Sequence, residues 1–372
     1  DHFLFFITLC LVAIGVVMVY SSSSKLSYEL YGENSYRYLK VQLVACALGL
    51  VCMVGASYFP YRYYEKYAKH ILLFSIFVLL TVYTPLGYSV RSETGKEFHR
   101  WIRVAGVQFQ PVELAKIGLV IYVSYFLSHK DDKKIRSLTQ GMLPNMLILF
   151  VFFVLLYKQP DFGSAVLLSS VVVVLLFVGG ARPSQIILLM GIACFFIYVS
   201  IQGDTYKMQR VQDFLASMKS SSYTSNHQVT RSLNALALGG LFGAGIGNSI
   251  YKLFYLPYPH TDFIFAILGE ELGFIGGVGV IGLFMLLIWR GIHIALRVTD
   301  SFASTLALGI TMLIGLQTVV NIGVVTGALP TKGITLPFIS YGGSSLLFSL
   351  VNIGILLNIS RGRNSPDLLG RV

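Results

Sequence analysis

The fold is decided by the stretch Tyr255-Leu-Pro-Tyr-Pro-His-Thr-Asp-Phe-Ile-Phe-Ala-Ile-Leu-Gly-Glu-Glu-Leu-Gly-Phe274, which leads into an apolar run ending near Trp289. A run of this length and composition predicts a helix that crosses a membrane. Three carboxylates, those of Asp262, Glu270 and Glu271, lie at its start or inside it. Because charge in such a position is costly, these residues indicate a functional site.

The composition extends this prediction to the whole chain. Hydrophobic residues make up 55% of the 372 residues and charged residues only 12%, whereas about a quarter of a soluble domain is charged. The formal net charge of +11 does not indicate nucleic acid as a partner, because the basic residues are scattered through short loops between apolar runs. We therefore predict an all-α, polytopic membrane protein that forms one integral-membrane domain over residues 1–372.

A membrane-spanning helix needs about 20 mostly apolar residues. About ten stretches qualify: 3–20, 41–58, 70–86, 108–127, 142–157, 164–180, 185–203, 263–289, 302–322 and 343–360. The short connections that carry Lys and Arg belong to one alternate set, and the positive-inside rule places this set and both termini in the cytoplasm.

The other set of connections holds the unusual segments. We expect a plain connection at 21–40 and a charged loop at 87–107. A large extracytoplasmic loop at about 204–260 includes residues 206–219, which have the spacing of an interfacial amphipathic helix. Within this loop, the Gly-rich run 239–247 predicts close backbone packing or a re-entrant turn.

Two polar groups interrupt apolar sequence in the first half of the chain. Glu113 and Lys116 are three residues apart and share one face of a helix. They form either a buried ion pair that neutralises itself or a pair that faces a substrate. Asp161, in the sequence Pro160-Asp-Phe-Gly163, is typical of a tight turn or a helix cap.

Two further polar groups lie in the second half. Asp262 either caps the helix that follows it or acts in an aqueous pocket at the bilayer surface. Glu270 and Glu271 lie deeper in that helix, where we expect them to satisfy polar groups or pair with cations as structural support. The segment 329–345 is so rich in Pro, Gly and Ser that it predicts irregular backbone lining a cavity.

These residues predict a polar cavity on the extracytoplasmic side that suits an anionic, lipid-linked substrate. The sequence has neither the Cys and His spacing of a zinc site nor a Ser-His-Asp signature. His260 is a single imidazole beside a proline, for which a structural role is favoured over metal ligation. The residues alone do not choose between a transporter and an enzyme.

Several blocks of the sequence resemble the SEDS family of bacterial cell-wall proteins, whose members include FtsW, RodA and SpoVE. The similarity runs from the first span to Ser360 and is carried by Arg100-Trp-Ile, Gln110-Pro-Val-Glu-Leu-Ala-Lys116, Gln159-Pro-Asp-Phe-Gly-Ser164, His260-Thr-Asp-Phe-Ile-Phe-Ala266, Glu270-Glu-Leu-Gly-Phe274 and Ile339-Ser-Tyr-Gly-Gly-Ser-Ser345. The blocks Lys252-Leu-Phe-Tyr-Leu-Pro257 and Leu329-Pro-Thr-Lys-Gly333 resemble the division branch, FtsW and SpoVE, more than the elongation branch, RodA. Tyr258 departs from that branch, which usually carries Glu there.

The resemblance implies an inverting peptidoglycan glycosyltransferase that polymerises lipid II and releases undecaprenyl pyrophosphate, in septal cell-wall synthesis. Asp262 matches the family's essential aspartate, the proposed general base. The leaving pyrophosphate needs positive charge, for which the candidates are Arg100, Lys116 and Lys332. Glu113 and Asp161 would orient these cations. Three further residues are expected to bind substrate: Trp101, His260 and Ser344.

The resemblance also implies partners and a location. It implies no definite cofactor, and Asp262 and Asp161 are compatible with a divalent cation, Mg²⁺ or Mn²⁺. The expected protein partners are a class B penicillin-binding protein transpeptidase and division-complex proteins, in the bacterial cytoplasmic (inner) membrane with the active site facing outward. Membrane lipid contacts the spans, and a lateral groove beside 206–219 would admit the lipid tail. The alternatives are a lipid II flippase, a RodA-type elongation polymerase and a scaffold without catalytic activity.

Overall fold

The computed structural model describes residues 1–32, 35–91, 97–104, 107–202, 208, 227–253, 255–257 and 259–362. In this part of the chain, seven helices are long and apolar enough to cross a membrane, and three shorter apolar helices accompany them. The long helices are α1 (His2–Tyr31), α2 (Arg37–Tyr58), α5 (Pro111–Ser128), α7 (Leu143–Lys158), α12 (Ile264–Arg297), α13 (Ser301–Val325) and α14 (Gly343–Gly362). The shorter ones are α4 (Ala68–Leu80), α8 (Phe162–Val178) and the apolar part Pro183–Ile192 of α9 (Pro183–Gln202). Helix α7 counts as long because its span begins at Leu138.

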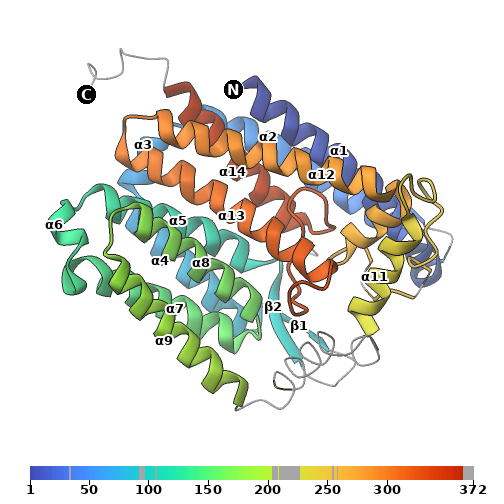
Figure 1. Cartoon of the computed structure of the whole chain (residues 1–372), viewed down its shortest axis with the longest axis horizontal. Coiled ribbons are helices and arrows are strands. Elements are labelled where there is room, and N and C mark those ends of the chain that lie inside the picture. The colour runs from blue at the N-terminus through green and yellow to red at the C-terminus, as the bar shows by residue number, and fades with distance from the viewer. Residues whose placement is uncertain are drawn as a thin grey trace.

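Each predicted span coincides with one of these helices, which confirms a helical, polytopic membrane protein. The helices lie side by side along one common direction, with α1, α2, α12 and α14 at one edge and α7 and α9 at the other (Figure 1). Helix α13 lies between them, packed against α12, α5 and α8. One continuous hydrophobic core joins residues from all the spanning helices.

The prediction that 87–107 is a loop was wrong. The 87–107 region, expected to be a charged loop, forms strands β1 (Gly87–Arg91) and β2 (Glu97–Val104), which are joined by β3 (Val107–Phe109) in an antiparallel sheet. The register of β1 against β2 shifts between Tyr88, which pairs with Trp101, and Ser89, which pairs with His99, so Arg100 is the extra residue at a bulge. The neighbouring Ile102 side chain is only 6% exposed.

The prediction that 21–40 is a plain connection was also wrong. Helix α1 continues to Tyr31 and α2 begins at Arg37. The serines of this stretch satisfy their hydroxyls inside the helix, because Ser22 and Ser23 donate to the carbonyl oxygens of Met18 and Val19 at 2.7 and 2.6 Å. Ser21, which is 5% exposed, donates instead to the carboxylate of Glu271 on α12.

Helix α12 is interrupted at Gly273, whose φ of 70° and ψ of −171° lie outside the helical region. The interruption leaves backbone groups unpaired within the helix. The Gly-rich run supplies their partners: Ala244 N and Gly245 N donate to the carbonyl oxygens of Glu270 and Glu271, at 2.9 and 3.0 Å. In return, the amides after Gly273 donate to Gly240 and Leu241. The predicted close backbone packing of 239–247 is confirmed.

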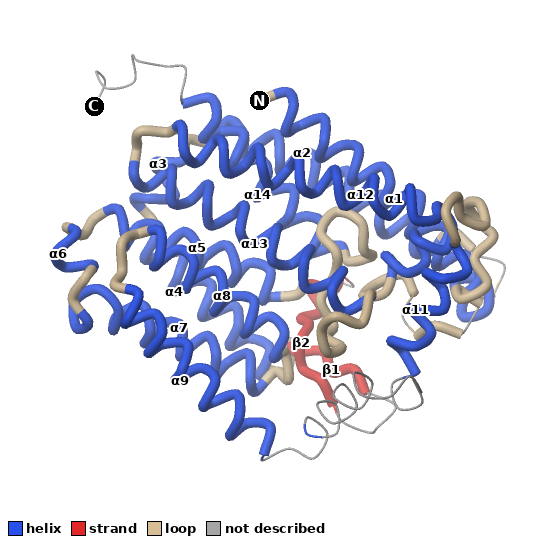
Figure 2. The backbone as a smooth tube through the Cα atoms, in the orientation of Figure 1, coloured by secondary structure: helices blue, strands red, loops and turns tan. Residues whose placement is uncertain are grey.

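The remaining elements cap the ends of the bundle. They are α3 (Tyr61–Lys66), α6 (Asp132–Ile135), α11 (His227–Gly239), a 3₁₀ turn at Thr81–Tyr83 and a π-helical turn at Leu138–Met142. The strands and the irregular segment before α14 lie next to each other at one end of the bundle (Figure 2). The predicted interfacial helix at 206–219 lies outside the described residues, apart from Met208.

Candidate functional site

Asp262 lies at the end of the bundle where the strands and the irregular segment meet. Helix α12 begins at Ile264 with Phe263 in the cap position, so Asp262 is not the capping residue and that alternative was wrong. The backbone of Asp262 is fixed by Asn321 of α13, whose Nδ2 donates to the carbonyl oxygens of Asp262 and Ile334 at 2.9 and 2.7 Å. One side-chain amide therefore ties the catalytic candidate to the irregular segment.

Arg100 reaches the same place from β2. Its guanidinium donates to the backbone carbonyl oxygens of Gln159, at 3.3 Å, and Pro160. Gly333 shows how close the two charged groups are: a Cβ atom added to it would lie 3.1 Å from Oδ2 of Asp262 and 3.9 Å from Nη1 of Arg100. The structure thus brings together three segments that are far apart in the sequence.

The environment of Asp262 raises the pKa of its carboxyl group. Burial is the largest cause and raises the pKa to about 6, the positive charge of Arg100 opposes this change, and the negative charge of Asp161 adds to it. Such a pKa lies close to neutral pH, where a general base is most effective. At pH 7 the group is mostly ionised and can still accept a proton.

Asp161 and Lys332 flank this pair. Asp161 caps α8, because its carboxylate accepts from Ser164 N at 3.2 Å and from Ser164 Oγ at 2.8 Å. The favoured prediction of a helix cap describes this geometry, and the effect on Asp262 adds an electrostatic role. The Lys332 ammonium lies 4.2 Å from the centre of the ring of Phe162, the residue that follows Asp161.

Glu113 and Lys116 form a buried ion pair on α5. Their side chains are 9% and 4% exposed, and Lys116 Nζ lies 2.8 Å from Glu113 Oε1. Lys116 also donates to Gln317 Oε1 at 3.2 Å, and Gln317 Nε2 donates to the carbonyl oxygen of Thr335 at 2.9 Å. Of the two alternatives, the self-neutralising pair describes this arrangement, and its link to Thr335 supports the segment that carries Gly333.

The other expected substrate-binding residues lie around this site in different environments. His260 is buried against the rings of Tyr38 and Tyr341, with centroids 5.0 and 5.6 Å away. Burial lowers the pKa of His260 to about 4, so its imidazole is neutral at pH 7. Ser344 accepts a hydrogen bond from Gln110 N at 3.1 Å. Trp101 is partly buried and pairs with Tyr88 across the sheet.

Glu270 and Glu271 point away from the Asp262 site and toward the loop that precedes it. Glu271 pairs with Lys252 at 2.9 Å, with side chains that are 0% and 8% exposed. Glu270 accepts from Ser249 Oγ and from Ile250 N, the latter at 2.7 Å. The two adjacent carboxylates therefore hold the 249–252 turn against α12.

Sequence reasoning missed the partners that hold the site together: Ser21, Lys252, Gln317, Asn321 and Gly333. Asn321 and Gln317 are polar residues four apart inside an apolar span. Polar residues in that setting usually mark a bundle-facing stripe, so this signal was present in the sequence. The identity of their partners depends on contacts between distant segments.

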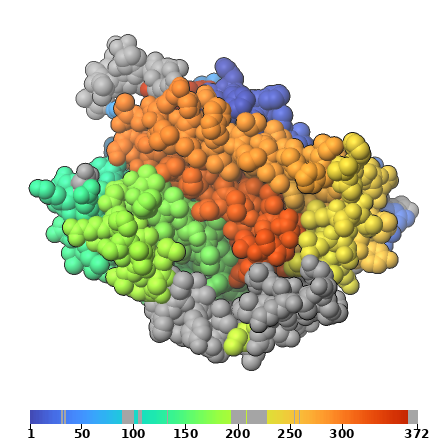
Figure 3. Space-filling model, in the orientation of Figure 1, coloured from blue at the N-terminus to red at the C-terminus, as the bar shows by residue number. Residues whose placement is uncertain are grey.

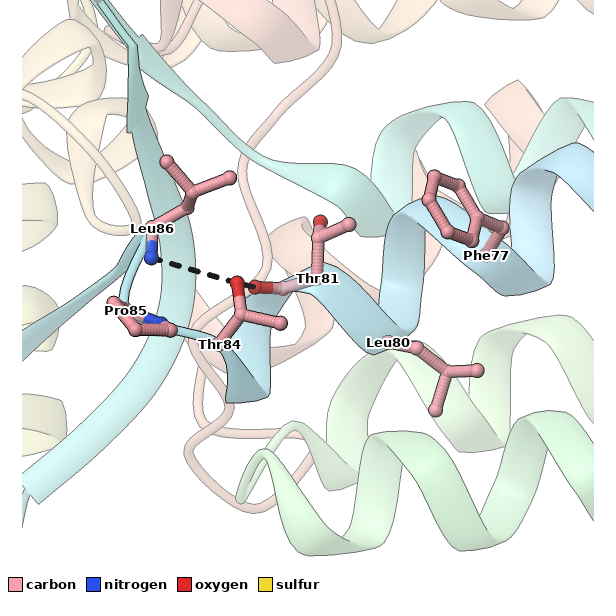
Figure 4. Close-up of a pocket in the computed structure, with 6 residues that line it drawn as sticks. All are labelled: Phe77, Leu80, Thr81, Thr84, Pro85 and Leu86. Atoms are coloured by element: carbon pink, nitrogen blue, oxygen red, sulfur yellow. Dashed lines mark hydrogen bonds between the residues drawn. The ribbon is translucent and has the colours of Figure 1, made fainter.

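A hollow of about 530 Å³ lies apart from these charged residues, at the end of α4. Figure 4 shows its lining, in which Thr84 Oγ1 accepts from Leu86 N at 3.4 Å beside apolar side chains. The lining residues are Phe77, Leu80, Thr81, Thr84, Pro85 and Leu86. None of them carries charge, so the hollow does not have the chemistry expected of the site.

A cation site made by the protein alone does not occur in the described part of the chain, where no group of three His, Cys, Asp or Glu side chains could hold a metal ion. Asp262 and Asp161 offer two carboxylates at most. Mg²⁺ is commonly bound through one or two carboxylates and completed by substrate phosphates. The residues therefore fit a divalent cation only as one that a phosphate-bearing substrate would help to bind.

The fold and the site define a class: a multi-pass membrane protein with one ionisable carboxylate and one arginine at the end of its helical bundle. The comparisons with known proteins assign the family. Residues 1–365 match the family described as FtsW, RodA and SpoVE, cell cycle protein. The chain belongs to this family.

Two curated relatives cover almost the whole chain. The probable peptidoglycan glycosyltransferase FtsW of Trichlorobacter lovleyi is 40% identical, covering 100% of this chain and 96% of its own length. The stage V sporulation protein E of Bacillus subtilis is 39% identical, covering 97% of both chains. The chain is thus similar to its relatives from end to end.

Solved structures agree with the fold. A chain from a structure titled "Structural coordination of polymerization and crosslinking by a peptidoglycan synthase complex" is 28% identical, with a TM-score of 0.80 and 98% of both chains covered. The rod shape determining protein RodA of Thermus thermophilus is 27% identical, with a TM-score of 0.71 and the same coverage.

Proposed function

We propose that this chain, a homologue of the peptidoglycan glycosyltransferase FtsW, polymerises lipid II with Asp262 as the general base. The observation that carries the proposal is the pairing of Asp262, with a pKa of about 6, with Arg100 beside Gly333. A base that accepts a proton near neutral pH and a cation that binds phosphate are the two groups that this reaction needs.

The reaction is a single displacement. The 4-hydroxyl of the acceptor GlcNAc attacks C1 of the donor MurNAc, a β-1,4 bond forms, and the bond from C1 to the pyrophosphate oxygen breaks. The bonding electrons leave with undecaprenyl pyrophosphate, and Asp262 takes the hydroxyl proton. Because the donor bond is α and the product bond is β, one inverting step suffices, and a second carboxylate is not required as a nucleophile.

Arg100 and Lys332 are the proposed clamp for the leaving pyrophosphate. Arg100 lies within reach of Asp262 through Gly333, and its planar guanidinium suits phosphate oxygens. Lys332 precedes Gly333 directly. We assign Lys116 a supporting role, because its ammonium is occupied by Glu113 and Gln317 inside the bundle. When a divalent cation is bound with the substrate, it would supply further positive charge to the same phosphates.

The membrane orientation and the partner are parts of the same proposal. The basic connections favour cytoplasmic termini, which puts Asp262 on the outer side of the bacterial cytoplasmic membrane. The first residues of α1 and the last residues of α14 lie at the end of the bundle opposite the strands (Figure 1), which agrees with this orientation. The solved relative comes from a complex that coordinates polymerization and crosslinking. It supports a class B transpeptidase as the partner here, and the FtsW names support a role in division.

The proposal is tested with purified protein, its transpeptidase partner and lipid II, followed by gel separation of the products. Glycan strands that lysozyme digests are the expected result. A parallel assay measures the movement of fluorescent lipid II across liposomes. Movement without strand formation would contradict the proposal and support the flippase alternative.

A further inference from the structure

A narrow groove runs along the surface between α8 and α13 and ends beside the proposed clamp. Its hollow measures about 90 Å³, which is smaller than the roughly 300–1,000 Å³ of a pocket for a whole small molecule. The groove is lined by Gly163, Val166, Leu167, Ser170, Leu316, Val320, Lys332 and Ile334. It has the size for a segment of a flexible chain.

The spacing of the lining residues makes the groove straight. The four from α8 follow the i, i+3, i+4, i+7 pattern of one helix face, and the two from α13 are one turn apart. From Gly163 to Ser170 the helix rises about 10 Å. Among the described lining residues, the one hydroxyl, that of Ser170, donates to Val166 O at 2.9 Å within its own helix, so this helical part of the groove needs no hydrogen bond from its occupant.

The groove faces outward from the bundle. Val166, Ser170 and Val320 are partly exposed, and the neighbouring Val319 is 59% exposed. Figure 3 shows this face, where the surface of α8 meets that of α13 and the segment before α14. Since α8 and α13 are apolar helices of a membrane protein, the occupant must be a group that is soluble in the hydrocarbon of the bilayer.

The end of the groove nearest Asp262 carries charge. Lys332 is the only charged residue among the described lining residues, and the next residue, Gly333, lies close to both Asp262 and Arg100. Gly163 allows this close approach, because a Cβ atom there would lie 3.1 Å from Ile334 and 3.7 Å from Lys332. An apolar groove with one cation in its lining, and with Arg100 close to Gly333, matches a hydrocarbon chain that ends in a pyrophosphate.

We infer that the groove between α8 and α13 holds the pyrophosphate-proximal isoprene units of the donor lipid, with its phosphates at Lys332 and Arg100. The inference rests on the proposed function, and it assigns the groove to the donor because the leaving pyrophosphate belongs to the donor. It differs in place from the groove expected beside 206–219.

The groove acts by orientation more than by hydrophobic attraction. A polyprenyl chain is already dissolved in apolar lipid, so moving it into the groove gains packing but little from leaving water. A chain held in line with the phosphates fixes the angle at which C1 meets the acceptor, and such alignment is worth far more than its contact energy. Filling the groove should therefore slow the reaction of long-chain donors without unfolding the protein.

Photocrosslinking tests the site without relying on catalysis. The probe is undecaprenyl pyrophosphate with a diazirine in the isoprene unit next to the phosphates, added to proteoliposomes of the full chain. We expect labelling of the α8 peptide around 163–170 and the α13 peptide around 316–320, and competition by unlabelled undecaprenyl pyrophosphate. Competition-sensitive labelling confined to other helices would overturn the inference, even if the wild type polymerises lipid II.

Substitutions supply the matched comparison. Val166→Trp and Val320→Trp place an indole in the groove, whereas Val319→Trp adds the same ring to the adjacent exposed surface of α13. We expect the two groove variants to lose specific labelling and to lower kcat/KM for lipid II about tenfold, or about 1.4 kcal/mol, with Val319→Trp unchanged. Equal effects of all three substitutions would contradict the assignment. Normal labelling in a wild type that makes no glycan would instead refute the proposed function alone.

Discussion

The two charged neighbours of Asp262 should move the pH dependence of polymerisation in opposite directions. The ionised carboxylate is the active form of a base, so activity is lost as the pH falls through its pKa. With that pKa at about 6, the ionised fraction falls from about 91% at pH 7 to about 9% at pH 5, and the rate should fall about tenfold.

Asp161→Asn removes a negative charge that raises the pKa of Asp262. The acid limb of the rate profile should therefore move to lower pH, and the rate at pH 5 relative to pH 7 should rise, by at most about the tenfold that protonation removes. Asparagine caps a helix as well as aspartate does, so the hydrogen bond to Ser164 N should survive. Arg100→Gln removes a charge that lowers the pKa, and its limb should move to higher pH.

Initial rates with fluorescent lipid II in proteoliposomes, measured every half unit from pH 5 to pH 8, give both profiles. The position of the limb is compared after each profile is scaled to its own maximum, because Arg100→Gln should also reduce the maximum rate through the lost phosphate contact. A limb that shifts in the same direction in both variants, or in neither, would refute the electrostatic description of the site.

Three further predictions follow from the packing around the site. Lys252→Met leaves the buried Glu271 carboxylate without its cation. This change should cost about 3–5 kcal/mol of folding stability and lower the thermal unfolding midpoint in detergent. The double variant with Glu271→Gln should recover most of the loss, and an unchanged midpoint in the single variant would contradict the buried pairing. Gly333→Ala crowds Oδ2 of Asp262 and should reduce kcat about tenfold or more. Gly55→Ala, with open space around its Cβ position, should leave kcat unchanged. Equal kcat values for the two variants would contradict the prediction. Gly273→Ala should lower the unfolding midpoint, because its φ of 70° and the contact with Gly243 exclude a side chain. An unchanged midpoint would show that the backbone at the break in α12 tolerates a side chain, which would contradict this prediction.

The spans were predictable because hydrophobicity and length alone define them. A helix in lipid satisfies every backbone group internally, so each of the ten predicted apolar stretches forms a helix. The same criterion failed at Ser21, Ser22 and Ser23, whose polar composition suggested a connection. Their hydroxyls bond within α1 or to Glu271, and this compensation is invisible in hydropathy.

The site was predictable residue by residue but not as an assembly. Asp262 and the Glu113–Lys116 pair were visible because charge inside apolar sequence is costly, and the i, i+3 spacing gave the pair directly. The approach of Arg100 to Asp262 depends on a small sheet that was expected to be a loop. Apolar and polar residues do not alternate strictly along 97–104, so the sequence carried no clear signal for that strand.

The resolution of the three carboxylates near the start of α12 also needed the fold. Spacing separated Asp262 from Glu270 and Glu271, but their partners come from residues 249–252 and from α1. Gly273 breaks the helix just after them and admits the Gly-rich run. The two adjacent buried glutamates are therefore satisfied by residues 249–252 of the loop together with Ser21 of α1.

The most direct test of the central claim compares wild type with Asp262→Asn and Asp262→Ala in polymerisation of lipid II, each with the transpeptidase partner present. Asparagine keeps the size of the side chain and removes its basicity. We predict that both variants fold, bind the partner and lose at least a hundredfold in strand formation, the range that a positioned base contributes. Glycan synthesis at the wild-type rate by either variant would contradict the account.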